Sequence, residues 1–167
     1  MSTVEFKDNS VKVSEAVTDA LIAGLYEVAG ELEAQTVRNS RQGHQYGDIQ
    51  ARELWKHQVD EGEMMAVVGS PYEAGYWEEF GTGEHALNGD GRQGWWVYIE
   101  GQESGNGGKS YSTQEEAEKA ANFLRKVAKL DAYATNGIDP NRPLHRAFQS
   151  LKPNIIKVLK NKLKGME

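Results

Sequence analysis

Two adjacent carboxylates, Glu78 and Glu79, followed closely by Glu84 and His85, come nearest in this chain to the residue types and spacing of general acid–base chemistry. A hydrolytic site of this kind needs a proton donor, a proton acceptor and an orienting group such as an imidazole. Side chains at i and i+1 on a helix point about 100 degrees apart, so the two carboxylates do not share one site without help from other elements. We therefore expect one of the pair to face solvent and the segment to have no catalytic role.

Metal and nucleotide chemistry find little support in the remaining residues. The chain has no cysteine, and its histidines are too scattered to form an HxxxH or HExxH pair: His44, His57, His85 and His145. A phosphate-binding loop of the GxxxxGK[ST] type fails because Lys109-Ser110 has Glu103 where the first glycine is required. We expect no metal, no cofactor and no enzymatic activity.

Aromatic residues are plentiful in the central part of the chain, and they could stack on bases or anchor a protein interface. They lie among acidic residues, where phosphate would be repelled, so the core and a subunit interface are the favoured uses. The aromatic residues concerned are Tyr72, Tyr76, Trp77, Phe80, Trp95, Trp96 and Tyr98.

Charge is distributed unevenly along the chain, whose formal net charge is −6. Residues 140–167 contain seven of the 19 basic residues and one of the 25 acidic residues. Such a basic block can dock subunits onto each other, lie near nucleic acid, or serve only as a solvated helix face. A possible basic contact face is formed by Lys152, Lys157, Lys160 and Lys164.

The elements that must position these residues follow from hydrophobic periodicity and turn signals. A length of 167 residues suits a single domain, residues 1–167, and no apolar run reaches the roughly 18 residues of a membrane span. We also expect no signal peptide, because the first residues lack a basic and then apolar order. The expected helices cover residues 11–41, 72–80, 113–129 and 144–164, and the expected strands cover residues 3–7, 49–59, 64–69, 95–99 and 131–137.

Local signals refine this outline. Ser70-Pro71 is expected to cap and open the short helix, Thr113 to begin a capping box, and Pro153 to kink or divide the last helix. Residues 42–48 are expected to form a loop. The prediction is an α+β fold, in which a small, mostly antiparallel sheet packs one face against a long N-terminal helix and a C-terminal helix. A loop-strand-helix excursion is inserted at about residues 84–136.

The order of motifs resembles a family of long-tailed bacteriophage proteins, the tail-completion or minor tail (head-tail joining) proteins of the lambdoid gene-ten-like type. A long N-terminal helix precedes Gly47-Asp48-Ile49 and a strand that ends at residues 67–70. The specific part is Tyr72-x-x-x-Tyr76-x-x-Glu79-Phe80-Gly81-Thr82-Gly83, followed later by Pro140-x-Arg142-Pro143-Leu144-x-Arg146-x-Phe148. The resemblance covers most of the chain.

The resemblance implies a structural virion protein at the head–tail junction or neck, assembled in the host cytoplasm as an oligomeric ring subunit. Its implied partners are copies of itself and neighbouring head-connector and tail-tube or tail-terminator proteins, with packaged DNA as a further candidate and no membrane. The implied fold and interface residues are Tyr72, Tyr76, Trp77, Glu79, Phe80, Gly81, Gly83, Arg142, Pro143, Arg146 and Phe148.

Within that motif we expect Tyr72 and Tyr76 to share a helix face, Phe80 to plug the core and Arg146 to pair with Glu79. The alternative, to which we give equal weight, is that the charged groups of Glu79 and Arg146 both lie in solvent. Two other functions stay open. One is a DNA-contacting connector or scaffold protein that uses the basic C-terminal helix, and the other is a small hydrolase that uses Glu79 and His85.

Overall fold

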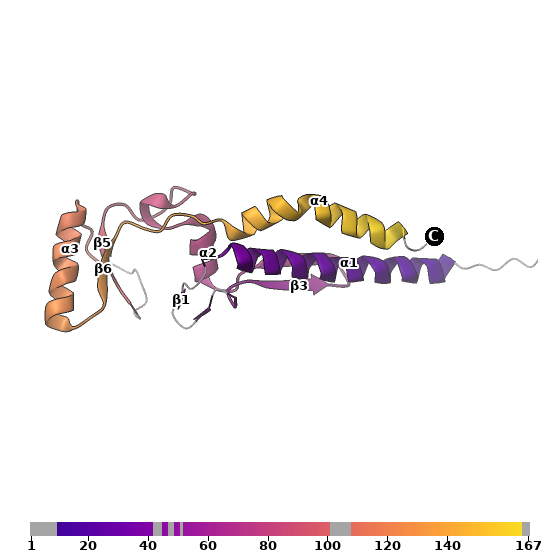
Figure 1. Cartoon of the computed structure of the whole chain (residues 1–167), viewed down its shortest axis with the longest axis horizontal. Helices are drawn as coiled ribbons and strands as arrows, with labels where there is room; N and C mark the ends of the chain where they lie inside the picture. Colours follow the sequence, from indigo (N-terminus) through magenta and orange to yellow (C-terminus); the bar gives the residue numbers. More distant parts are fainter. Residues whose placement is uncertain (1–9, 42–44, 47–48, 51, 101–107, 165–167) are drawn as a thin grey trace, which may run out of the picture.

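The computed structural model describes residues 10–41, 45–46, 49–50, 52–100 and 108–164. Figure 1 shows an elongated molecule with a body at one end and a smaller outer lobe at the other. The body contains α1 (Ser10–Asn39), β3 (Lys56–Asp60), β4 (Met65–Gly69), α2 (Glu73–Phe80) and α4 (Pro143–Lys164). The outer lobe contains β5 (Trp96–Ile99), α3 (Gln114–Phe123), a π-helical turn (Leu124–Ala128) and β6 (Ala132–Thr135).

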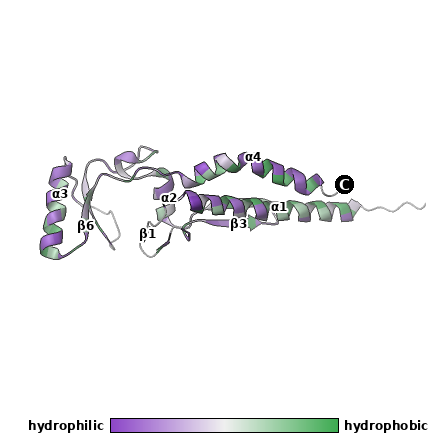
Figure 2. Cartoon of the chain, in the orientation of Figure 1, coloured by the Kyte–Doolittle hydropathy of each residue, from purple (hydrophilic) through white to green (hydrophobic). Residues whose placement is uncertain are grey.

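The two long helices lie side by side and run in opposite directions (Figure 1), and the expected N-terminal helix is confirmed. Gly24 permits this close approach, since a Cβ at that position would lie 3.0 Å from Cδ2 of Leu159. An ion pair of 2.9 Å between Lys162 and Glu27 links the helices at their polar edge. Figure 2 shows apolar residues along α1, including the part that extends beyond the end of α4.

The predicted hairpin is also confirmed, because β3 and β4 pair antiparallel from Lys56↔Gly69 to Asp60↔Met65. Its turn is closed by a hydrogen bond of 3.0 Å from the amide of Glu63 to the carboxylate of Asp60. Met64 follows in the left-handed region with φ 48°. The hairpin packs on α1, and α4 packs on α1 and α2.

The body has a small core beneath the end of α1. Leu54 and Trp55 are almost fully buried beside Ala74, with Trp77 and Leu144 packed against them. The Trp55 indole N–H donates to the hydroxyl of Ser40 at 2.8 Å, and that hydroxyl donates to the carbonyl of Thr36 at 3.1 Å. A buried polar chain therefore ties the segment before β3 to the last turn of α1.

The short helix α2 begins differently from the sequence prediction. Its N-cap residue is Tyr72, and no side chain caps the helix. Ser70 instead closes a local turn, in which its hydroxyl accepts from the amide of Tyr72 and donates to the carbonyl of the same residue, both at 3.1 Å. The cap prediction was wrong because a serine hydroxyl can bond the backbone two residues ahead as readily as a helix terminus.

In the outer lobe, α3 packs on the antiparallel pair of β5 and β6. The contact is made by alanines, because Ala117, Ala121 and Ala132 are all 0% exposed. Thr113 caps α3 by accepting from the amide of Glu116, as predicted, although the Glu116 carboxylate bonds the amide of Ser112 rather than the cap residue. Small side chains let the helix approach the strands closely, which leaves this lobe with a thin core.

The α+β class is confirmed, with its strands distributed over three two-stranded ladders. The third ladder pairs β1 (Gln45–Tyr46) with β2 (Ile49–Gln50) inside and next to the segment that was predicted to be a loop. Residues 3–7 and the Gly47-Asp48 motif lie outside the described residues. The final helix α4 is continuous through Pro153 and curves along its length (Figure 1), so the division of the helix is not observed. In the described residues, no helix has the length and apolarity of a membrane span.

Candidate assembly interface

Both carboxylates of α2 are buried, with Glu78 1% and Glu79 8% exposed, so the expectation that one faces solvent was wrong. Glu79 accepts hydrogen bonds from the backbone amides of Leu144 at 2.9 Å and His145 at 3.1 Å. These amides belong to the first turn of α4, where helix N–H groups have no partner within the helix. Glu79 therefore caps α4 from another helix, and its negative charge favours the positive end of the helix dipole.

Glu78 ties the end of α1 to the segment before α4. Its carboxylate accepts from the Arg41 backbone amide at 2.9 Å and forms an ion pair of 3.3 Å with the Arg41 guanidinium. Asn141 donates to the same carboxylate, and its own backbone amide donates to the Glu78 carbonyl at 3.0 Å. The adjacent carboxylates thus hold three segments together although their side chains diverge on the helix.

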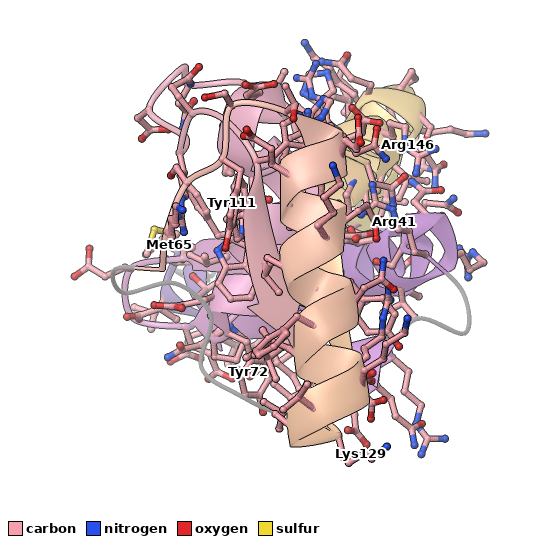
Figure 3. All side chains as sticks on the ribbon, turned by 90° about the vertical axis from the view of Figure 1, so that its left-hand side faces the viewer. Arg41, Met65, Tyr72, Tyr111, Lys129 and Arg146 are labelled. Carbon is pink, nitrogen blue, oxygen red and sulfur yellow. The ribbon has the colours of Figure 1, made fainter. Side chains whose placement is uncertain are left out.

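Arg146 does not pair with Glu79, which corrects the sequence hypothesis. Its guanidinium donates to the carbonyl of Asn39 at 2.6 Å and to the side chain of Asn141 at 2.8 Å. Seen from the α3 end (Figure 3), Arg41 and Arg146 lie on one side of the molecule and Met65 on the other. Arg146 therefore reinforces the same junction from outside, by closing the last turn of α1.

Two glycines of the motif, Gly81 and Gly83, direct the chain from α2 into the outer lobe. Gly81 and Gly83 have φ values of 75° and 61°, in the region that glycine adopts without steric cost. A Cβ on Gly83 would lie 2.1 Å from the carbonyl oxygen of Asn136, so the returning strand passes directly over it. The outgoing and returning segments are also joined by hydrogen bonds between Thr82 and Ile138.

Glu84 fastens the same connection. The side-chain amide of Asn136 and the backbone amide of Gly94 donate to its carboxylate, at 3.1 Å and 3.0 Å, and these bonds lower the pKa of Glu84 below its ordinary value of 4.5. The nearby His85 contacts Asp139 at 2.9 Å and Asn136 at 3.3 Å. His85 and Glu79 thus have separate partners, and the Glu79–His85 pair of the hydrolase hypothesis is not among the contacts of these two described residues.

An open apolar trough runs along the body between the long helices and the hairpin. Its floor is the face of α1 that carries Leu25, Val28 and Leu32, and one wall is β4 with Ala66 and Val68. The other wall is α4, with Phe148, Ile155 and Leu159. The helix α2 closes one end with Tyr76 and Phe80. The trough encloses about 730 Å³, which is far more than one side chain fills and within the range of binding cavities.

The sequence motif and the trough coincide in large part. Six of the predicted interface residues line the trough: Tyr72, Tyr76, Glu79, Phe80, Arg142 and Phe148. Trp77 packs against the small core of Leu54 and Trp55, and Pro143 is buried. Gly81 and Gly83 form the connection to the outer lobe, and Arg146 lies at the junction of α1 and α4. The rings of Tyr76 and Phe80 pack in a tilted arrangement, with centroids 4.8 Å apart and an interplanar angle of 41°. Tyr72 is the N-cap residue before α2 and so is not on a face of the helix with Tyr76.

The outer edge of α4 beside the trough forms a ridge of exposed apolar and basic side chains, which we call the α4 lip: His145, Phe148, Lys152, Ile156 and Leu163. Its last four members follow at intervals of four, four and seven residues, which places them along one helix face. The four predicted contact lysines are all exposed but do not form one face. Lys152 belongs to the lip, whereas Lys157 is about 140 degrees further round the helix.

The remaining aromatic residues of the predicted set, Trp95, Trp96 and Tyr98, lie in and beside the outer lobe, where cations lie over some of the aromatic rings. The guanidinium of Arg92 lies 5.0 Å from the ring centroid of Trp96, and Arg125 lies 5.8 Å from that of Tyr133. Tyr133 pairs across the strands with Tyr98, and both remain partly exposed. Among the described residues no group of three metal-ligating side chains occurs.

No protein-family model, no curated protein and no solved structure matches this chain.

Proposed function

We propose that the chain is a structural subunit at the head–tail junction of a long-tailed bacteriophage, where it forms a homo-oligomeric ring and joins head-connector proteins to tail-tube or tail-terminator proteins. The proposal begins from the motif between Tyr72 and Phe148 that resembles tail-completion and minor tail proteins. It is supported by the convergence of six motif residues on one open apolar trough. A surface of this kind marks a site of protein association more often than a solvated face.

The distribution of buried residues agrees with an assembly subunit. The largest fully buried apolar side chains in the described part of the body are Leu54 and Trp55, and most of the apolar stripe of α4 is only partly covered. Protein surfaces rarely leave a large contiguous apolar area open unless it binds something. A second protein over the trough would complete the core of the body, as it does in obligate assemblies.

Electron microscopy of a phage that lacks the gene tests this function. In a long-tailed phage that encodes the chain, deletion is expected to yield DNA-filled heads and separate tails, and expression of the wild-type chain from a plasmid should restore joined particles. Joined, infectious particles in the absence of the chain would refute the proposal. Empty, unexpanded heads would instead indicate a role in head assembly.

A further inference from the structure

The apolar trough lies beside cations rather than in a neutral surface. The formally charged residues of its lining are Arg142 and Glu79, and the Glu79 carboxylate is already engaged by the amides of α4. The lining also includes His145. The α4 lip adds Lys152, and α4 contains no acidic residue from Pro143 to Lys164. An occupant that matches this surface therefore combines exposed apolar side chains with acidic ones.

The turn of the β3–β4 hairpin has this combination. Residues 57–91 contain no lysine or arginine, and the turn contributes Asp60, Glu61 and Glu63, all exposed. Met64, Met65 and Val67 follow, each between 49% and 52% exposed. We call residues 60–67 the hairpin tip. Methionine side chains adapt to irregular apolar surfaces, which suits them to a contact that forms between subunits.

Two apolar side chains of the tip, Met65 and Val67, are not turned toward the trough of their own chain. Ala66 and Val68 line the trough, and neighbouring residues of a strand point to opposite faces, so Met65 and Val67 lie on the outer face of the hairpin. Met64 is held in the left-handed region at φ 48°, at a cost of about 1 kcal/mol that glycine would avoid. The chain thus keeps a large exposed apolar side chain where its backbone favours glycine.

Other exposed apolar sites of the described residues match the lip less well. Phe123 at the end of α3 and Val127 in the π-helical turn are close in sequence to Lys119 and Lys126, which would face the lip with like charge. Val11 and Val13 at the start of α1 flank Lys12. Compared with these two sites, the hairpin tip has an acidic rim and contains no lysine or arginine, so charge complementarity favours it.

We propose that the hairpin tip of one copy docks on the α4 lip and trough of a second copy. The two surfaces differ, so the contact is heterologous and propagates from copy to copy until a ring closes. This inference rests on the proposed function only in that it names the contact between ring subunits. The contact itself can be tested in solution.

Charge reversal with a mixing step tests the contact by sedimentation velocity. Wild-type protein is examined at concentrations up to about 100 µM, at which a contact with a Kd of about 10 µM would be largely occupied, and it is expected to self-associate. Glu63→Lys and Lys152→Glu should each weaken association at least about tenfold, because like charges then face each other. An equimolar mixture of the two variants should associate again, because each contact between unlike copies then joins opposite charges.

Two further variants separate this contact from folding defects and from general charge effects. Lys157→Glu makes the same charge change on another face of α4 and should associate like wild type. Met64→Gly should unfold at a higher temperature and still associate more weakly, a combination that loss of folding cannot produce. Circular dichroism checks that every variant is folded.

A wild-type chain that stays monomeric, a mixture that does not recover, or an equal loss with Lys157→Glu would overturn the contact. Capture of a duplex oligonucleotide that depends equally on Lys152 and Lys157 would do the same, because the basic helix would then bind a polyanion. The variants could recover association on mixing while the deletion phage still forms joined particles. That combination would refute the proposed function and leave the contact standing. A need for the chain in head–tail joining, with association unaffected by both reversals, would refute the contact alone.

Discussion

Replacing Glu79 by alanine is expected to destabilise the body by about 3 kcal/mol, because it removes the acceptor of two amides in the first turn of α4. Both bonds have ordinary hydrogen-bond lengths, 2.9 Å and 3.1 Å, and Glu79 is 8% exposed. A hydrogen bond to a charged group contributes about 1.5 to 3 kcal/mol, and water can reach part of the vacated space, so the loss is below the sum of two such bonds. Glu79→Gln keeps one acceptor oxygen and should lose about half as much.

Urea denaturation, followed by tryptophan fluorescence, measures this loss, since Trp55 is 2% exposed and becomes solvated on unfolding. With a denaturant slope of about 2 kcal/mol per molar urea, the midpoint should fall by about 1.5 M in Glu79→Ala. Glu73→Ala, on the exposed first turn of the same helix, should change stability by no more than about 0.5 kcal/mol. A Glu79→Ala variant as stable as this control would refute the capping role. Coupling above about 1 kcal/mol between Glu79 and Arg146 would contradict their separate partners.

The remaining predictions concern glycines and pH. Gly30→Ala should stabilise the chain by up to about 1 kcal/mol, because nothing lies within 4 Å of the Cβ that it adds. Gly24→Ala should stabilise the chain less, or destabilise it, because the added Cβ would lie 3.0 Å from Cδ2 of Leu159. Thermal unfolding of the two variants measures the difference. Gly83→Ala should lower the unfolding temperature by several degrees more than Gly89→Ala, since both glycines have positive φ but only the former meets backbone at 2.1 Å. Stabilisation through Glu84, whose pKa is lowered by its bonds to Asn136 and Gly94, should be present above its ordinary value of 4.5 and lost as pH falls through the lower folded value; Glu84→Gln should flatten that acid dependence in pH-resolved melts.

The elements that depend on local pattern were predictable from the sequence. The apolar spacing of α1, the turn residues of the β3–β4 hairpin and the capping residue of α3 each act within a few positions. Local rules predicted the position of α2 but not its cap, because Ser70 closes a turn instead of capping the helix. They also could not show that α4 would stay continuous through Pro153.

The candidate site was only partly predictable, because its geometry joins distant segments. Glu78 and Glu79 are buried because Arg41 and the first turn of α4 reach them from positions 37 and 65 residues away. Adjacent side chains on a helix diverge, as expected, and here each finds a different partner. The trough floor at Val28 and the hairpin tip at Met64 were not singled out, because an apolar helix face and an exposed methionine look the same in sequence whether or not another chain covers them.

The most direct test of a head–tail joining role is complementation in a lysate of the deletion phage. Purified wild-type chain, added to the heads and tails that accumulate without it, is expected to restore infectious particles by several orders of magnitude in titre. A wild-type lysate serves as the positive control, because it should join the same heads and tails. If the wild-type lysate restores the titre and the purified chain does not, the account is contradicted.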